Sequence, residues 1–510
     1  MAGTRSSVAS RRFETLAAVL LLAGVSAAAL SWCYREGYLL YYGDAAAHVN
    51  IARRIVDSRT PGYPQIGTVW LPLPHLLMLP LVGDDGMWRT GLAGGLPSAA
   101  FYVIGGAFFF AGLRRLFGGA GAAAGTAAWA LNPNLLYLQS LPMTEAIFAG
   151  CLGALFYFTV RFRNAPSLKT AAAAGVAALA GTLTRYEGWF LLPFVALYLL
   201  LAAKPRRWGA ALLFAAVASA GPLYWLAHNY WFYGDPLEFY RGPWSAKAIY
   251  QRALDSGMAP YPGDGDLWTA AHYYLAAARL CAGWPLAALG AAGALLALWR
   301  RKWWPVALLA LPPVFYVWSL YSAGTPIFVP HLWPHSWYNT RYGLAALPLL
   351  GVGAAALAAT PRRFRWAAAA GVVAAALLPW ILSPAPESWI CWKESQVNSE
   401  QRRAWTREAA EYLERHYTGG GVIHGFGDLT GVFQEAGIPL KETLHEGNTL
   451  EFYAALGRPD LFLDEEWAVA ISGDPVATAI LRARRSGPEY ECVKMIALKD
   501  APVIEIYRRK

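Results

Sequence analysis

Eleven apolar stretches, most of them without a charged residue, run through the first three quarters of the chain. Each approaches the ~20 residues that an α-helix needs to cross the hydrocarbon core of a bilayer. The pattern therefore predicts a polytopic α-helical membrane protein with about eleven transmembrane helices. The predicted spans are residues 15–33, 93–113, 119–139, 145–161, 170–185, 187–203, 208–227, 280–299, 303–322, 342–360 and 366–384.

Basic residues lie in six short clusters between these stretches. The clusters are Arg11/Arg12, Arg114/Arg115, Arg161/Arg163/Lys169, Lys204/Arg206/Arg207, Arg300/Arg301/Lys302 and Arg362/Arg363/Arg365. Cytoplasmic loops of membrane proteins are enriched in Lys and Arg, and eleven spans place all six clusters on one face. The sequence thus predicts a multi-pass protein of the cell (plasma or inner) membrane, with a cytoplasmic N-terminus and an extracytoplasmic C-terminus.

Three long segments fall on the predicted outer face: residues 34–92, residues 228–279, and the tail from residue 387. In the first, the stretch from Gly43 to Asp57 is predicted to form an amphipathic helix on the membrane. The tail changes to the pattern of a soluble α/β domain. Helices are predicted at 399–416, 430–436, 447–456 and 474–485, and strands at 422–427, 491–497 and 502–508. Two domains are expected: residues 1–386, which cross the membrane and carry the first two long loops, and an extracytoplasmic α/β domain, residues 387–510.

Composition agrees with this division. The chain is 56% hydrophobic and 15% charged, against about 25% charged residues in soluble domains. Residues 1–386 hold 28 basic and 13 acidic residues, whereas residues 387–510 hold 15 basic and 20 acidic residues. Because the basic residues are divided among loops between spans, we expect no nucleic-acid partner and we expect contact with membrane lipid.

The five cysteines show no metal-finger or CxxC spacing. Cys33, Cys151 and Cys281 lie in or beside apolar runs, where a packing role is expected. Cys391 and Cys492 both lie in the tail, and a disulfide between them is an open alternative in an oxidising compartment.

Five ionisable residues from distant parts of the chain are predicted at the same outer level of the bilayer. They are Asp44, Glu145, Arg185, Glu187 and Arg341. Ionisable groups at membrane depth are costly and are therefore functional candidates. We expect a polar cavity that opens outward between the spans.

Each candidate also has a structural interpretation. Asp44 is suited to act as a general base or as a helix cap, and His48 would share its face of a helix. Glu145 fits the start of a span, and Arg185 with Glu187 fits a local ion pair. Arg341 is suited to gripping phosphate or to anchoring at lipid headgroups.

Asp44 is the predicted catalytic residue, and the predicted substrate-binding residues are Glu145, Arg185, Glu187, His48, His335, Arg341 and Tyr342. His331 and His335 are four residues apart, but Pro334 disfavours the helix that would align them on a metal ion. No metal ligand and no cofactor is assigned, and a divalent metal has only weak support.

The motifs around these residues resemble those of the GT-C superfamily of membrane glycosyltransferases, which includes protein O-mannosyltransferases and lipid A aminoarabinose transferases. The motifs are YYGDAAAHV in the first loop, PMTE, TRYEG and NTRYG, in this order along residues 1–386. The resemblance implies a bundle of membrane helices, an extracytoplasmic site and a sugar donor linked to a polyprenyl phosphate. It also implies that the first-loop acid, Asp44, is catalytic and that Arg341 and Arg185 contact the donor phosphate.

The first loop departs from the family pattern at one position. Many members carry two adjacent acids there, whereas Asp44 is followed by Ala45. This departure weighs against a metal-dependent mechanism and leaves Glu145 as the candidate second acid.

The expected function is sugar transfer from a polyprenyl-phosphate carrier to a protein, lipid or glycan acceptor. The alternatives are a transporter or lipid flippase, for which no matching halves are visible, and an assembly or sensory protein that works through its tail.

Overall fold

The computed structural model describes residues 2–202, 207–427, 429–485 and 487–510. Lys204 and Arg206, which belong to one of the predicted cytoplasmic clusters, lie outside the described residues. The chain forms two compact units. The membrane unit comprises Met1–Arg35, Thr68–Leu73 and Leu96–Glu394, and the sheet unit comprises Glu36–Gly67, Pro74–Gly95 and Ser395–Lys510.

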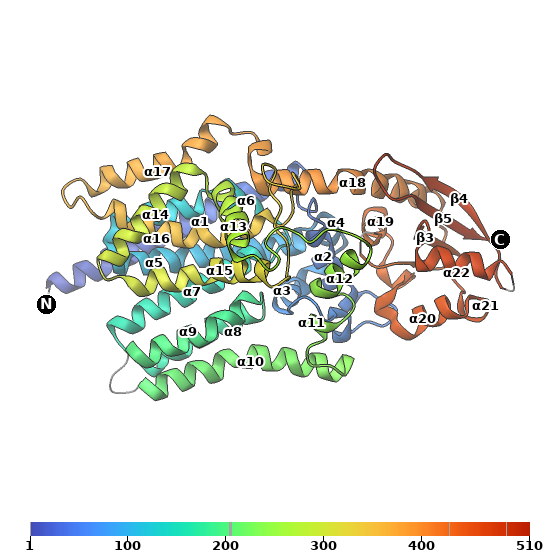
Figure 1. The fold of residues 1–510 in the computed structure, drawn as a ribbon, viewed down its shortest axis with the longest axis horizontal. Coiled ribbons are helices and arrows are strands. Elements are labelled where there is room, and N and C mark those ends of the chain that lie inside the picture. Colours follow the sequence, from blue (N-terminus) through green and yellow to red (C-terminus); the bar gives the residue numbers. More distant parts are fainter. Residues whose placement is uncertain (1, 203–206, 428, 486) are drawn as a thin grey trace. The chain divides into compact units, whose positions relative to one another are not determined.

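Helices account for nearly all regular structure of the membrane unit (Figure 1). They are α1 (Ala2–Arg35), α5 (Leu92–Ala130), α6 (Pro133–Leu138), α7 (Glu145–Asn164), α8 (Leu168–Thr182), α9 (Glu187–Ala202), α10 (Arg207–Tyr233), α11 (Glu238–Arg241), α12 (Ala246–Asp255), α13 (Leu267–Ala282), α14 (Trp284–Trp299), α15 (Trp303–Tyr321), the 3-10 helices η2 (Thr340–Ala346) and η3 (Pro386–Ser388), α16 (Leu347–Ala358) and α17 (Arg365–Leu382). A helix lies within every predicted span.

Within the described residues, seven helices are long and apolar enough to cross a membrane, or eight when the bent pair α13 and α14 counts as one span. The chain is therefore a multi-pass membrane protein. Helix α5 contains the predicted span 93–113 and the first part of the span 119–139, separated by the non-helical backbone of Gly118. Helices α8 and α9 have only 15 and 16 residues. The count of eleven stays a prediction.

The predicted span 280–299 is interrupted near its start. Gly283, with φ 78°, ends α13, and α14 starts at Trp284 after a bend of 112°. A positive φ is easily adopted by glycine because it has no Cβ. The segment before the bend, predicted as part of an outer loop, is the helix α13.

Glycine contacts bring the site-bearing helix α16 very close to α14. A Cβ atom on Gly353 would lie 1.8 Å from the carbonyl oxygen of Gly290, and one on Gly293 would lie 2.0 Å from that of Gly353. Only residues without a side chain permit this approach of two backbones, which is a common way to pack membrane helices. The middle of α16 therefore packs backbone against backbone on α14.

The sheet unit is built on five strands in the order β2-β1-β3-β5-β4. The strands are β1 (Val422–His424), β2 (Thr443–Leu444), β3 (Trp467–Ile471), β4 (Tyr490–Ile496) and β5 (Ile504–Arg509). β1 pairs in parallel with β2 and β3, and β5 pairs antiparallel with β3 and β4. The predicted α/β fold of the tail is confirmed.

Both faces of this sheet are covered, so β1 and the first four residues of β3 and of β5 are buried. The helices and 3-10 helices of the unit are α2 (Gly43–Val56), η1 (Tyr63–Ile66), α3 (Leu73–Val82), α4 (Asp85–Thr90), α18 (Ile390–His416), α19 (Thr430–Ala436), η4 (Leu440–Glu442), η5 (Glu446–Asn448), α20 (Thr449–Gly457), α21 (Pro459–Phe462) and α22 (Pro475–Ala483). Trp467 and Val469 join one core with Val49 and Trp88, and Ala468 and Ala470 join the core on the other face.

This packing changes the domain boundaries that the sequence suggested. Residues 34–92 were expected to be a loop of the transmembrane domain, and the tail was expected to begin at residue 387. In the structure, most of this loop belongs to the sheet unit because its apolar residues complete one face of the sheet. The C-terminal part of that unit begins within α18, at Ser395. The helix predicted from Gly43 to Asp57 is present as α2, but its Val49 and Ala52 pack in the core of the sheet unit rather than facing the membrane as predicted.

Candidate functional site

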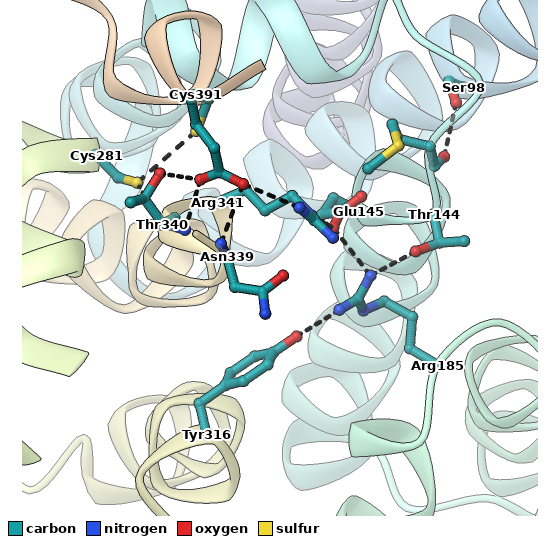
Figure 2. A network of polar contacts seen from close by, with 12 residues as sticks. Ser98, Thr144, Glu145, Arg185, Cys281, Tyr316, Asn339, Thr340, Arg341 and Cys391 are labelled. Atoms are coloured by element: carbon teal, nitrogen blue, oxygen red, sulfur yellow. Dashed lines mark hydrogen bonds and ion pairs between the residues drawn. The ribbon is translucent and has the colours of Figure 1, made fainter. Parts of the chain in front are cut away.

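Four charged residues that the sequence singled out come together in the membrane unit. Figure 2 labels Glu145, Arg185 and Arg341 among them. Glu145 is the first residue of α7, and Glu187 is the first residue of α9. Arg185 lies in the turn between α8 and α9, and Arg341 lies in η2, just before α16. The charges therefore lie at the starts of helices rather than in their middles. The helix dipole favours the two carboxylates at these starts.

Arg185 is the centre of the first half of the network. Its Nη1 donates to Glu145 Oε1 at 3.0 Å, its Nε to Glu187 Oε1 at 2.5 Å and its Nη2 to the hydroxyl of Tyr316 at 2.7 Å. The Tyr316 hydroxyl donates in turn to Glu187 Oε1 at 2.7 Å. Arg185 also donates to the Thr144 hydroxyl. The local ion pair that the sequence suggested is therefore present, and it is one part of a larger network.

Arg341 connects this half to a third carboxylate. Its Nε lies 3.2 Å from Glu145 Oε1, and its Nη1 lies 3.0 Å from Glu394 Oε1. Glu145 Oε1 thus bridges two guanidinium groups. The other oxygen, Glu145 Oε2, is buried and accepts no hydrogen bond from the described residues. Glu145 is the under-satisfied member of the network, and an unpaired buried acceptor is costly.

Glu394 was missed by the sequence reasoning, which assigned it to the soluble tail. It is 1% exposed and accepts from the backbone N–H of Asn339 at 3.1 Å and of Thr340 at 2.6 Å. The Thr340 hydroxyl also donates to it. The available signal was its neighbourhood, SWICWKES, because an acid within an aromatic, apolar stretch needs a partner.

Two tyrosine rings complete the site. Tyr342 stacks on Tyr316 with ring centroids 4.6 Å apart. The guanidinium carbons of Arg185 and Arg341 lie 5.4 Å and 5.3 Å from the centre of the Tyr342 ring. Cations at this distance are attracted by the face of an aromatic ring. Tyr342 therefore lies beside both cations.

The network lines a cavity of about 40 Å³. Its charged and aromatic wall consists of Glu145, Arg185, Glu187, Tyr316, Arg341 and Tyr342, and its apolar wall includes Trp129, Leu152 and Pro348. This volume holds a few water molecules at most. The network itself contains three carboxylates and two guanidinium groups, in a site where charges interact strongly because little water screens them.

Two of the other predicted residues belong to the sheet unit. Asp44 and His48 belong to α2 of the sheet unit. Asp44 is in the first turn, whereas the N-cap position is Tyr42, so the cap interpretation of Asp44 is wrong. His48 is buried, with its Nδ1 2.9 Å from His75 Nε2.

His335 does not join the charged network in the described structure. It is exposed in the loop before η2, where its Nδ1 lies 3.2 Å from the carbonyl oxygen of Pro330. His331 lies beside Arg279, with 3.3 Å between Nε2 and Nη2. Among the residues that the structure describes, no group of three or more His, Cys, Asp or Glu side chains is arranged to hold a metal ion.

Known proteins resemble this chain in part of its sequence and in its fold. Residues 86–231 match the family model of dolichyl-phosphate-mannose-protein mannosyltransferases. The crystal structure of ArnT from Cupriavidus metallidurans bound to undecaprenyl phosphate is similar, with 16% identity, a TM-score of 0.58 and coverage of 96% of this chain and 97% of that chain. The same protein in the apo state gives 15% identity, a TM-score of 0.54 and coverage of 99% and 98%. No curated protein matches the sequence significantly.

The chain has the fold of the GT-C class of membrane glycosyltransferases, as its motifs predicted. The likeness extends over nearly the whole length of both chains, so it includes the sheet unit for which the sequence offered no family motif.

Proposed function

We propose that this chain is a glycosyltransferase that moves a sugar from a polyprenyl-phosphate carrier to an acceptor at the outer face of the membrane. One observation carries the proposal: Glu145, Arg185 and Arg341, distant in sequence, meet around one cavity at the starts of membrane helices in a chain with the GT-C fold. The match to a family of dolichyl-phosphate-mannose users, and to a structure holding undecaprenyl phosphate, supports a lipid-phosphate donor.

The bridging oxygen of Glu145 marks the place for the donor phosphate. Arg185 and Arg341 both direct N–H groups at this oxygen. Guanidinium groups bind phosphate oxygens with the same geometry as carboxylates, so a phosphate oxygen can replace Glu145 Oε1 between them. Glu145, already left with one unpaired oxygen, would then turn to accept a hydroxyl of the sugar or the acceptor.

The proposed reaction breaks the bond between the anomeric carbon and the phosphate oxygen, while the acceptor oxygen forms a bond to that carbon. Negative charge grows on the departing phosphate, and Arg341 and Arg185 stabilise it in a site poor in water. Asp44 takes the proton of the acceptor hydroxyl. Glu187 orients Arg185, while His48, His335 and Tyr342 contact substrate.

The observed cavity is too small for a sugar ring. Donor binding therefore includes an opening of the site, and displacement of Glu145 from the two arginines is a step of that opening. The phosphate replaces one anion, the Glu145 carboxylate, by another between Arg185 and Arg341. Binding of the phosphate to the two arginines therefore offsets the loss of their contacts with Glu145.

The transport alternative predicts charges near the middle of the spans. The charged groups of this network instead lie at the first residues of α7 and α9 and just before α16. This placement favours a site reached from one face of the membrane, as a transferase requires.

A donor panel tests the proposal. Purified full-length protein is incubated with polyprenyl-phosphate sugars that differ in sugar and carrier length, and mass spectrometry follows free carrier phosphate and transferred or hydrolysed sugar. We expect carrier release with at least one donor, and none with the Arg185→Ala/Arg341→Ala double variant. Movement of intact donor across liposome membranes without carrier release would establish the flippase alternative and overturn the proposal.

A further inference from the structure

Two thiols of the membrane unit face one another beside the charged network. The Sγ atoms of Cys281 and Cys391 are 3.9 Å apart, although the residues are separated by 110 positions in the chain. Cys281 lies in the last turn of α13, and Cys391 is the second residue of α18. Both side chains are fully buried, and Figure 2 shows them pointing toward each other.

Asparagine side chains fix both cysteine backbones in place. Asn134 Oδ1 accepts the backbone N–H of Cys391 at 2.9 Å, and Asn134 Nδ2 donates to the carbonyl oxygen of Cys281 at 3.1 Å. Asn132 donates to the same carbonyl at 2.8 Å. One buried amide thus bridges the two backbones, so the facing thiols are a built feature of the fold.

We propose that Cys281 and Cys391 form a disulfide in the mature protein. A sulfur–sulfur bond measures about 2.05 Å, so the two Sγ atoms must approach by roughly 1.9 Å, which side-chain rotation and a small backbone shift supply. The inference is independent of the reaction proposed above. It replaces the pairing of Cys391 with Cys492 that the sequence left open.

The chemistry is thiol–disulfide exchange with an oxidised dithiol of the compartment. The thiolate of one cysteine attacks the disulfide of the oxidant, which forms a mixed disulfide and releases one thiolate. The second cysteine then attacks the sulfur of the first and releases the other thiolate. Two S–H bonds and one S–S bond of the reactants become one S–S bond in the protein and two S–H bonds in the reduced oxidant.

Compartment and burial decide when the bond forms. In the proposed orientation, the residues that follow the last span, Cys391 among them, are extracytoplasmic, where disulfides persist. The folded protein covers both thiols completely, so the exchange precedes final packing. Once formed, the bond is shielded from reductants in the same way.

The disulfide would secure the segment that presents Glu394. This residue follows Cys391 by three positions, close to one turn of α18, and its carboxylate binds Arg341 and the Thr340 backbone. In the reduced protein, the Cys281 thiol donates to the Thr340 carbonyl at 3.2 Å. The cross-link would therefore join α13 and α18, which both contact the backbone of Thr340, through Cys281 and Glu394 respectively.

Thiol counting on the full-length protein tests the inference. Isolated membranes are dissolved in denaturant that contains a first alkylating reagent, which labels every free thiol. The protein is then purified and reduced, labelled with a second alkylating reagent and analysed by mass spectrometry. Of the five cysteines, we expect three to carry the first label, and Cys281 and Cys391 to carry the second. First label on all five, or a Cys391–Cys492 peptide before reduction, would overturn the proposal.

Matched variants identify the pair without depending on activity. In Cys281→Ser, Cys391 should gain the first label and no residue should carry the second. In Cys151→Ser, which removes a buried cysteine of α7, Cys281 and Cys391 should still carry the second label. Second label on Cys391 in Cys281→Ser would show a different partner and exclude the proposed bond.

Discussion

Arg341 and Glu394 form a buried ion pair, with 3.0 Å between Nη1 and Oε1. The two side chains are 9% and 2% exposed, and Glu394 also accepts two backbone N–H groups of the segment that carries the arginine. Glu394 therefore sets the position of η2 as well as compensating the charge of Arg341. A buried carboxylate of this kind is expensive to neutralise while its partner stays in place.

Glu394→Gln should retain the shape of the side chain and lose the charge. Removal of one member of a buried pair costs about 3–5 kcal/mol, so we expect a clear fall in the detergent melting temperature together with reduced transferase activity. Glu400→Gln, on the exposed side of the same helix, is the matched control and should leave both unchanged. An unaltered melting temperature in Glu394→Gln would contradict the structural role.

Arg341→Lys tests whether the fork of the guanidinium is needed. Lysine keeps the positive charge but cannot direct two fixed N–H groups at Glu145 and Glu394 together. If Arg341 stabilises the departing phosphate, kcat should fall about 10²–10³-fold, as for the loss of one oriented donor. The measurement is the rate of carrier release with the donor found in the panel.

Arg363→Lys provides the comparison, since Arg363 is exposed in a basic cluster away from the network. It should keep full activity. Equal kcat values for Arg341→Lys and the unaltered protein would assign Arg341 to packing or headgroup contact alone.

Asp44→Asn tests the proposed base. Asparagine cannot accept a proton at neutral pH, so sugar transfer should be lost while the melting temperature and binding of the carrier lipid are largely retained. Glu36→Gln removes a nearby exposed acid of the same loop and should leave transfer intact. Full activity of Asp44→Asn would remove Asp44 as the base.

The extent to which sequence predicts such a site depends on what each residue signals locally. Glu145, Arg185, Glu187 and Arg341 were identified because each interrupts or borders an apolar run, and membrane sidedness then placed them at one level. Glu394 gave a weak signal because it closes the short aromatic stretch SWICWKES where the polar tail begins, and its carboxylate is paired only through contacts with residues 339–341.

The same limit applies to the fold. Apolar runs predicted a helix in every span, but the bend at Gly283 depends on one residue with positive φ. In the tail, β1, β4 and β5 were predicted, whereas β2 and β3 were missed. The reason is clearest for β3. Its sequence, WAVAI, is a short apolar run buried on both faces, which lacks the alternation of a half-exposed strand.

Gly353→Leu should disrupt the contact between α14 and α16. A Cβ atom there meets the carbonyl oxygen of Gly290 at 1.8 Å, and backbone cannot move aside as a flexible side chain can. Overpacking costs typically about 1–3 kcal/mol, so the melting temperature should fall. Gly371→Leu, where a Cβ atom meets nothing within 4 Å, should leave it unchanged, and equal melting temperatures for both variants would contradict the close helix contact.

Two buried histidines should make the sheet unit sensitive to acid. Burial lowers the pKa of His424 to about 4 and that of His445 to about 2, so both are neutral in the folded unit at pH 5. In the unfolded chain, both histidines bind protons below about pH 6.5. The stability of the sheet unit is therefore unaffected by these histidines above pH 6.5 and falls as the pH drops below this value. At pH 5, the loss is about 2 kcal/mol for each histidine.

Hydrogen exchange of the β1 and β3 amides between pH 7.5 and 5, corrected for intrinsic rates, measures this loss as a smaller free energy of opening. His424→Gln should remove the share of one histidine from the pH dependence, because glutamine does not titrate. His416→Gln, at an exposed position, should leave the dependence unchanged. Identical pH dependence in His424→Gln and the unaltered protein would show that His424 is not held neutral by burial, since its protonation would then cost the folded sheet nothing.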